Sequence, residues 1–143
     1  MLGPSAQIDT FARDNLPPRE QWPEFLLEGF DYPDHVNAAV ELTDRMVERG
    51  FGDNTALIGN GRRRTYKELA DWSNRLARAL VEDYGVKPGN RILIRSANNP
   101  AMVACWLAAL KAGAVAVNTM PMLRAGELTK IVNGAAGIKA DLM

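Results

Sequence analysis

The chain has 143 residues, with 17 Lys and Arg against 17 Asp and Glu, one His, one Cys and 47% hydrophobic residues. A charged fraction of 24% with zero net charge argues against disorder of the whole chain and against nucleic-acid binding driven by bulk charge. A single Cys excludes a disulfide within the chain and suits a reducing compartment. The sequence contains no run of about 18 apolar residues, which is the length needed to span a membrane. Asp9, Arg13 and Asp14 interrupt any stretch that resembles a signal peptide. We therefore expect a cytoplasmic globular protein.

The charge is unevenly distributed along the chain. Residues 1–50 hold 4 basic and 10 acidic residues, for a net charge of −6, whereas residues 51–143 hold 13 and 7, for a net charge of +6. Because proline blocks long regular elements, the proline-rich residues 1–35 are predicted to form a loop-dominated lead-in with one short helix around Ile8–Asn15. Its large aromatic residues are expected to anchor it on its own domain, and a partner-binding arm is the alternative. These aromatic residues are Phe11, Trp22, Phe25 and Phe30.

Regular elements follow the lead-in. Apolar residues at helical spacing predict a helix over residues 36–47, with Gly50 as its stop. Two strand-like runs, residues 56–58 and 64–66, flank Gly59-Asn60-Gly61. Since Gly and Asn accept the positive φ of a tight turn, this segment predicts a β-hairpin. A hairpin is also a better interpretation of these glycines than a phosphate-binding loop, because no buried helix follows the turn directly.

The remaining elements predict an α/β fold. Thr65 and Glu68 form a capping-box pattern at the start of a long helix. Residues 91–94 are predicted to form a strand, residues 98–112 a buried helix, and residues 114–117 a second strand. Strand, helix and strand in this order form a right-handed βαβ unit in a partly parallel sheet. With a last helix over residues 124–132, residues 36–143 are predicted to form a partial α/β domain.

Residues that could carry chemistry are sparse. His35 is the one histidine, and Cys105 lies inside the apolar helix, so no metal site is apparent and Cys105 is interpreted as a core residue, not a nucleophile. The segment 96–99 follows a predicted strand and precedes a helix, which is where ligands of parallel sheets bind. Asn98 or Asn99 acting as a simple helix N-cap is the favoured interpretation of this segment.

Three segments, in order, resemble the adenylate-forming enzymes. Arg64-Thr65-Tyr66-Lys67-Glu68-Leu69 resembles their early "Leu-Thr-Tyr-x-Glu-Leu" motif, and Gly85-Val86-Lys87-Pro88-Gly89-Asn90-Arg91-Ile92 resembles "Gly-Val-x-x-Gly-Asp-x-Val". Leu107-Ala108-Ala109-Leu110-Lys111-Ala112-Gly113-Ala114 resembles "Leu-Ala-x-x-Lys-Ala-Gly-Ala". The lead-in segments 11–18 and 22–23 are most similar to 2-aminobenzoate–CoA and benzoate–CoA ligases. The resemblance implies the truncated N-terminal part of an adenylate-forming enzyme fold.

The resemblance also implies an activity. Such ligases use ATP and Mg²⁺ to convert a carboxylate into an acyl-adenylate and then transfer the acyl group to coenzyme A. Their phosphate loop, ribose-binding Asp and catalytic Lys lie further along the family sequence, so no catalytic residue and no metal ligand is assigned in this chain. The one residue implied for a cofactor is Arg124, as a contact to a CoA phosphate. The best-aligned position for that contact is Met122, which departs from the basic residue found in some members.

The sequence therefore favours an N-terminal portion of an ATP-dependent aryl-CoA ligase, expected to be inactive on its own and to hold no cofactor. The alternative is a non-catalytic binding or regulatory module derived from such a ligase. Residues 134–143 match the family poorly. Sheet edges left uncovered around residues 92–94 and 115–117 predict self-association as a homodimer, with no nucleic-acid or membrane partner.

Overall fold

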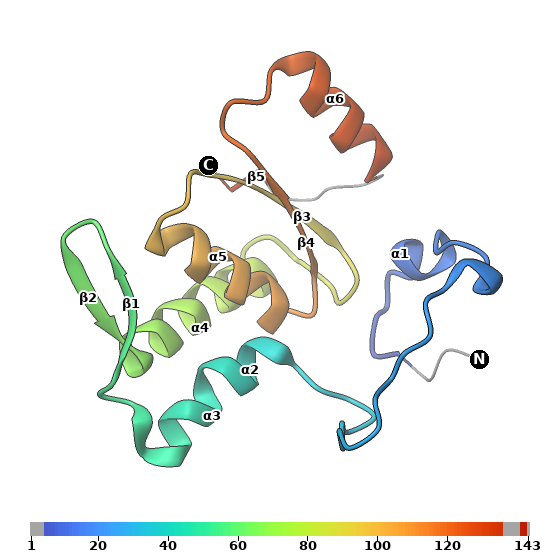
Figure 1. Cartoon of the computed structure of the whole chain (residues 1–143). Helices are drawn as coiled ribbons and strands as arrows, with labels where there is room; N and C mark the ends of the chain where they lie inside the picture. The colour runs from blue at the N-terminus through green and yellow to red at the C-terminus, as the bar shows by residue number, and fades with distance from the viewer. Residues whose placement is uncertain (1–4, 136–140, 143) are drawn as a thin grey trace.

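The computed structural model describes residues 5–135 and 141–142. Figure 1 shows the lead-in at one end of the molecule, the β-hairpin at the other, and two long helices and a parallel sheet between them. Residues 136–140, which are half of the segment that matches the family poorly, lie outside the described residues. Within the described part, no helix is long and apolar enough to cross a bilayer.

The parallel sheet is built as the sequence predicts. Strand β3 (Arg91–Arg95), helix α5 (Pro100–Lys111) and strand β4 (Val115–Thr119) form the βαβ unit. β3 pairs in parallel with β4 on one side and with β5 (Asp141–Leu142) on the other, giving the order β4-β3-β5. The segment 92–94 thus has strand neighbours on both sides, whereas segment 115–117 lies on β4, whose other edge no described strand covers.

Helix α4 (Tyr66–Glu82) packs against α5 and starts at the predicted capping box. The Glu68 N–H donates to Thr65 Oγ1 at 3.2 Å, and the Thr65 N–H donates to Glu68 Oε2 at 2.9 Å. These two bonds satisfy N–H groups that the first turn of a helix leaves free. Two adjoining core clusters bury one face of α4, with Leu80 among the residues of the first and Leu69 among those of the second.

The hairpin of β1 (Thr55–Gly59) and β2 (Arg62–Thr65) is confirmed. Asn60 and Gly61 adopt the positive φ angles, 53° and 70°, that its turn requires. A Cβ at Gly59 would lie 2.8 Å from Cγ of Pro100, so the absence of a side chain lets β1 approach the first turn of α5. The hairpin is therefore fixed against the helical layer.

The helix predicted over residues 36–47 is interrupted. Helix α2 (Ala38–Leu42) begins at its N-cap Asn37, and α3 (Asp44–Met46) and a π-helical turn, η2 (Val47–Phe51), follow it. The break falls at buried Thr43, whose hydroxyl donates to the carbonyl of Ala39 at 2.6 Å. A threonine that bonds the preceding turn in this way bends the helix, and periodicity alone does not report it. Helix α6 (Ala125–Gly134) closes the described part before β5.

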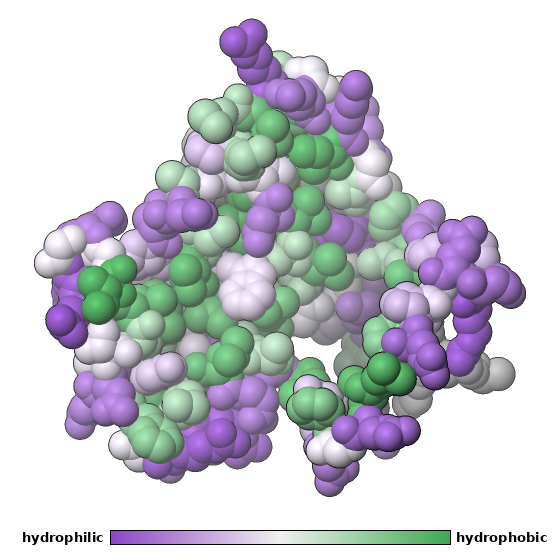
Figure 2. All heavy atoms as spheres, viewed as in Figure 1, coloured by the Kyte–Doolittle hydropathy of each residue, from purple (hydrophilic) through white to green (hydrophobic). Residues whose placement is uncertain are grey.

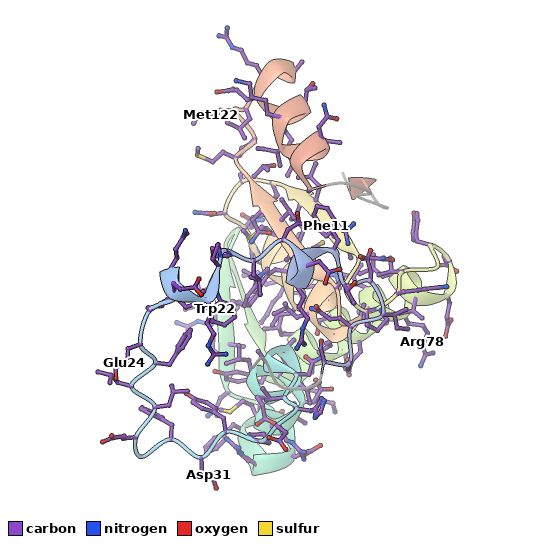
Figure 3. All side chains as sticks on the ribbon, turned by 90° about the vertical axis from the view of Figure 1, so that its right-hand side faces the viewer. Phe11, Trp22, Glu24, Asp31, Arg78 and Met122 are labelled. Atoms are coloured by element: carbon purple, nitrogen blue, oxygen red, sulfur yellow. The ribbon has the colours of Figure 1, made fainter. Side chains whose placement is uncertain are left out.

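The lead-in contains helix α1 (Phe11–Asp14) and a 3₁₀ helix, η1 (Arg19–Gln21), and is otherwise loop. Figure 3 places Phe11 against the body of the molecule, where the guanidinium of Arg91 lies 4.6 Å from the centre of its ring. The prediction for Phe25 and Phe30 is wrong, because they are 64% and 63% exposed. Trp22 is half-buried, and its indole N–H donates within the lead-in to the carbonyl of Pro17. Figure 2 accordingly shows apolar side chains at the surface of the lead-in as well as over the main body.

Candidate functional site

A pocket of about 360 Å³ lies at the carboxyl ends of β3 and β4. The loops that follow these two strands form its walls, which is the place where parallel sheets bind ligands. The lining is mostly apolar with a few amide and hydroxyl groups. Its residues are Ser96, Ala97, Asn98, Met102, Asn118, Thr119, Met120, Pro121 and Met122.

The hydroxyl of Thr119 is the unusual polar group of this pocket. Its Oγ1 is buried, and within the described residues it has no hydrogen-bond partner. Leaving a buried hydroxyl without a partner costs about 1–3 kcal/mol. Because Oγ1 itself is buried, a ligand in the pocket would satisfy this hydroxyl only after a movement of the side chain.

The helix that borders the pocket is capped by Asn99, as the favoured interpretation predicts. Asn99 Oδ1 accepts the N–H of Met102 at 2.9 Å, and its amide donates to Ser96 Oγ at 3.2 Å. Asn98 has no role in the cap and is exposed on the pocket wall. The loop is therefore held by Asn99 and leaves the Asn98 side chain available at the pocket.

The second wall is held by a residue that sequence reasoning missed. Arg95, at the end of β3, donates through Nη2 to the carbonyls of Pro121 at 2.6 Å and Leu123 at 3.0 Å. A charged donor on two carbonyls fixes the loop after β4 relative to β3. The only sequence signal for this role was a charged residue directly after the apolar run of a strand.

Arg124 stands at the N-cap position of α6, at the end of this same loop. Its backbone N–H donates to Glu127 Oε2 at 2.9 Å, and its side chain is exposed. Its guanidinium has no hydrogen bond or ion pair with any described residue. The loop thus carries an exposed cation two positions after Met122, which lines the pocket and is 80% exposed.

Other candidates from the sequence lie away from the pocket. His35 is exposed, and Cys105 is half-buried and packs against the first core cluster, where burial raises the pKa of its thiol. Across residues 5–135 and 141–142, no three His, Cys, Asp or Glu side chains are grouped so that they could hold a metal ion. The glycines around Asn60 form the hairpin turn described above.

Comparison with known proteins now decides the family. Residues 44–140 match the family described as AMP-binding enzyme. The chain belongs to this family. It is 35% identical over 101 residues to the 3-hydroxybenzoate–CoA/4-hydroxybenzoate–CoA ligase of Thauera aromatica, an alignment that covers 71% of this chain and 19% of that protein. It is 34% identical over 90 residues to the benzoate–CoA ligase of the same organism, over 62% of this chain and 17% of the relative.

Two solved structures share the fold. The N-terminal subdomain of NpsA from Klebsiella oxytoca, in complex with 3-hydroxyanthranilyl-AMSN, superposes with a TM-score of 0.64 at 27% identity, over 71% of this chain and 26% of that one. The anthranilate CoA ligase AuaEII, in complex with anthranoyl-AMP, gives a TM-score of 0.68 at 24% identity, over 75% of this chain and 20% of that one. The chain spans about a fifth of the length of the curated relatives named above.

The family motifs occupy structural positions in this AMP-binding chain. The first motif supplies β2 and the capping box of α4, and the second enters β3. The Lys111 of the third motif has a side chain only 5% exposed, and its Nζ lies 2.6 Å from Asp44 Oδ2 and 2.7 Å from Asn74 Oδ1. In this chain that lysine connects α5 to α3 and α4, so it stabilises the packing of these helices.

Proposed function

We propose that this chain is the N-terminal portion of an ATP-dependent aryl-CoA ligase and that it does not catalyse the reaction by itself. The full reaction converts an aromatic carboxylate, ATP and CoA into aryl-CoA, AMP and pyrophosphate through an acyl-adenylate. The observation that carries the proposal is the 35% identity to a hydroxybenzoate–CoA ligase over 101 residues. Benzoate and 2-aminobenzoate are the proposed substrates, and the single Cys supports a reducing, cytoplasmic setting.

The chain's own contribution is to shape and hold the pocket at the ends of β3 and β4. ATP and Mg²⁺, when bound, supply the activation that makes the carboxylate a good acyl donor, and we assign none of residues 1–143 to them. Two side chains near the pocket have the chemistry to bind CoA. Among the described residues, the Arg124 guanidinium has no partner and can bind a phosphate, and the Thr119 hydroxyl likewise lacks a partner.

The absence of catalysis is tested with a coupled assay for AMP release. The purified chain is incubated with ATP, Mg²⁺, CoA and either benzoate or 2-aminobenzoate. We expect AMP formation no faster than in a reaction without protein. AMP release that depends on both the chain and the aromatic acid would contradict this part of the proposal.

The role of Arg124 is tested by titrating the chain with CoA and with dephospho-CoA, which lacks the 3′-phosphate. We expect CoA to bind more tightly, and Arg124→Gln to remove that difference. Lys130→Gln, which also removes one exposed cation from α6, should leave the difference unchanged. Met122→Arg, which supplies the cation that the resemblance places there, should strengthen CoA binding. Equal binding of both ligands by the unaltered chain would contradict the assignment.

The alternative function, a non-catalytic binding or regulatory module, has one structural observation in its favour. The lining residues of the pocket all lie within residues 96–122, and they include exposed amide and apolar groups that a small ligand could contact. Saturable binding of CoA or ATP in the micromolar range, with no AMP release, would support this function. No binding of either ligand at millimolar concentration would contradict it.

A further inference from the structure

The lead-in carries a surface that is both acidic and apolar. Its residues 20–34, called the acidic arm below, contain five carboxylates and no Lys or Arg. The carboxylates are Glu20, Glu24, Glu28, Asp31 and Asp34. Figure 3 shows Glu24 and Asp31 pointing away from the body of the molecule. The arm also carries exposed apolar and aromatic side chains, of which Phe30 and Tyr32 stack with ring centres 5.8 Å apart.

A basic groove of about 310 Å³ lies on the opposite end of the molecule, between β2 and α4. Its lining, called the arginine groove below, consists of Arg62, Arg64, Glu68, Asp71, Trp72 and Arg75. The guanidinium of Arg64 lies 4.5 Å from the centre of the Trp72 ring, so the groove presents a stacked cation and an aromatic face. Within the described residues β2 has only β1 as a strand neighbour, which leaves this side of the hairpin open.

The two surfaces cannot meet within one chain. In Figure 1 the hairpin lies at the left and the lead-in at the right, with α4 and α5 between them. The arm holds five carboxylates and no Lys or Arg, whereas the groove holds three arginines and two carboxylates, so their net charges are −5 and +1. Opposite charges held apart on one molecule attract the complementary surface of another copy.

We propose that two copies of this chain associate by placing the acidic arm of each on the arginine groove of the other. In this arrangement each contact occurs twice, as a two-fold symmetric dimer requires. Arg75 pairs with a carboxylate of the arm, and Arg62, whose Nη2 lies 3.2 Å from Glu68 Oε1 in its own chain, adds an arm carboxylate to that pair. The arm's aromatic rings stack on guanidinium groups, which arginine favours. The exposed Phe25 and Phe30 are covered in the same contact. The self-association predicted from the sequence is thereby assigned to the charged surfaces and not to the free edge of β4.

The test measures association by sedimentation equilibrium at tens of micromolar chain. We expect a dimer in 50 mM NaCl whose dissociation constant rises about tenfold or more in 500 mM NaCl, because salt screens exposed charges. Glu24→Arg, Glu28→Arg and Asp31→Arg together change the net charge of the arm from −5 to +1, and Arg62→Glu with Arg75→Glu changes that of the groove from +1 to −3. Each of these two variants alone should be monomeric under the same conditions. An equimolar mixture of the two should form heterodimers, since both contacts are then again between opposite charges.

A matched control separates this contact from a general effect of charge. Lys87→Glu with Lys130→Glu makes the same charge change as the groove variant at exposed positions elsewhere, and it should leave the dimer unchanged. Circular dichroism establishes that each variant is folded, and the salt dependence of the unaltered chain tests the contact without any substitution. A monomeric unaltered chain at low salt would overturn the proposal. So would association that neither salt nor charge reversal weakens, as pairing at β4 predicts, or a mixture that fails to form heterodimers.

Discussion

The carboxylate of Asp9 lies 2.5 Å from the guanidinium of Arg91, and this pair fastens the start of the lead-in to the central strand of the parallel sheet. The Arg91 side chain is 7% exposed and also donates to the carbonyls of Gly89 and Ala135, each at 3.0 Å. One side chain therefore connects the lead-in, the entry to β3 and the end of α6. Asn90, directly before β3, supports the same junction by donating its amide to Asp9 Oδ2 at 2.9 Å.

The Asp9–Arg91 pair should make the stability of the folded chain depend on pH. The backbone N–H of Phe11, followed by the Arg91 guanidinium, lowers the pKa of Asp9 below its ordinary value of 3.8. A carboxyl with a lower pKa in the folded state stabilises the protein above its unfolded pKa, and that stabilisation is lost as the pH falls through the folded pKa. We expect the gap in urea midpoint between the unaltered chain and Asp9→Asn to be full above about pH 5 and to shrink below about pH 4.

The control for this measurement is Asp53→Asn, which removes an exposed carboxylate. Its urea midpoint should follow that of the unaltered chain across the same pH range. A pH-dependent gap of equal size in both variants would show that general charge repulsion, and not the Asp9–Arg91 pair, sets the acid sensitivity.

Gly89 should be required for the same junction. It has a φ of +90°, and a Cβ there would overlap the backbone carbonyl oxygen of Asp9. Gly61 has a φ of +70° with nothing within 4 Å of a Cβ, so Gly61→Ala isolates the backbone strain, about 1 kcal/mol. We expect Gly89→Ala to destabilise the chain more than Gly61→Ala does. It should also speed proteolytic cleavage within residues 5–35 several-fold, and equal cleavage in both variants would contradict this role.

How much of this fold the sequence predicts depends on how local the signal is. The hairpin turn at Asn60-Gly61 and the capping box of Thr65 and Glu68 involve residues within a few positions of one another, and both are confirmed. The βαβ unit is predicted from the apolar runs and from the order strand, helix, strand along the chain. This prediction does not require the register in which β3 and β4 pair. The helix break at Thr43, which the sequence did not predict, also has a local cause. The hydrogen bond from the Thr43 hydroxyl to the Ala39 carbonyl does not change the spacing of apolar residues, so periodicity cannot reveal it.

Long-range contacts explain what the sequence does not predict. Nothing in the spacing of Asp9 and Arg91 indicates that they pair, because the contact joins elements distant along the chain. The same holds for Arg95, which holds the pocket loop through two carbonyls. The large aromatic residues of the lead-in led us to expect that each would contact the domain. The structure shows instead that Phe25 is exposed, whereas Phe11 packs against the guanidinium of Arg91.

Lys111, although it belongs to a family motif, should prove structural when removed. Its buried ammonium contacts Asp44 and Asn74. Burial raises the pKa of Asp44, but hydrogen bonds from Asn74 and Lys111 outweigh that effect, so the pKa of Asp44 is lowered. Lys111→Met leaves that carboxylate without its cation, so we expect a loss of about 2 kcal/mol in the free energy of unfolding. Lys87→Met, at an exposed position, should change it by less than about 0.5 kcal/mol. Equal effects of the two variants in urea titrations would contradict the role of Lys111.

The two threonines Thr119 and Thr65 should respond in opposite ways to replacement by valine. Thr65 Oγ1 accepts the N–H of Glu68, so Thr65→Val removes a helix cap and should cost about 1 kcal/mol of unfolding free energy. The buried Thr119 Oγ1 has no partner among the described residues, so Thr119→Val removes a desolvated hydroxyl and should stabilise the chain by up to about 1 kcal/mol. Urea titration of both variants in one buffer gives the comparison. If the pocket takes a ligand through this hydroxyl, the more stable Thr119→Val chain should also bind CoA more weakly, whereas a loss of stability would mean that the hydroxyl is already satisfied.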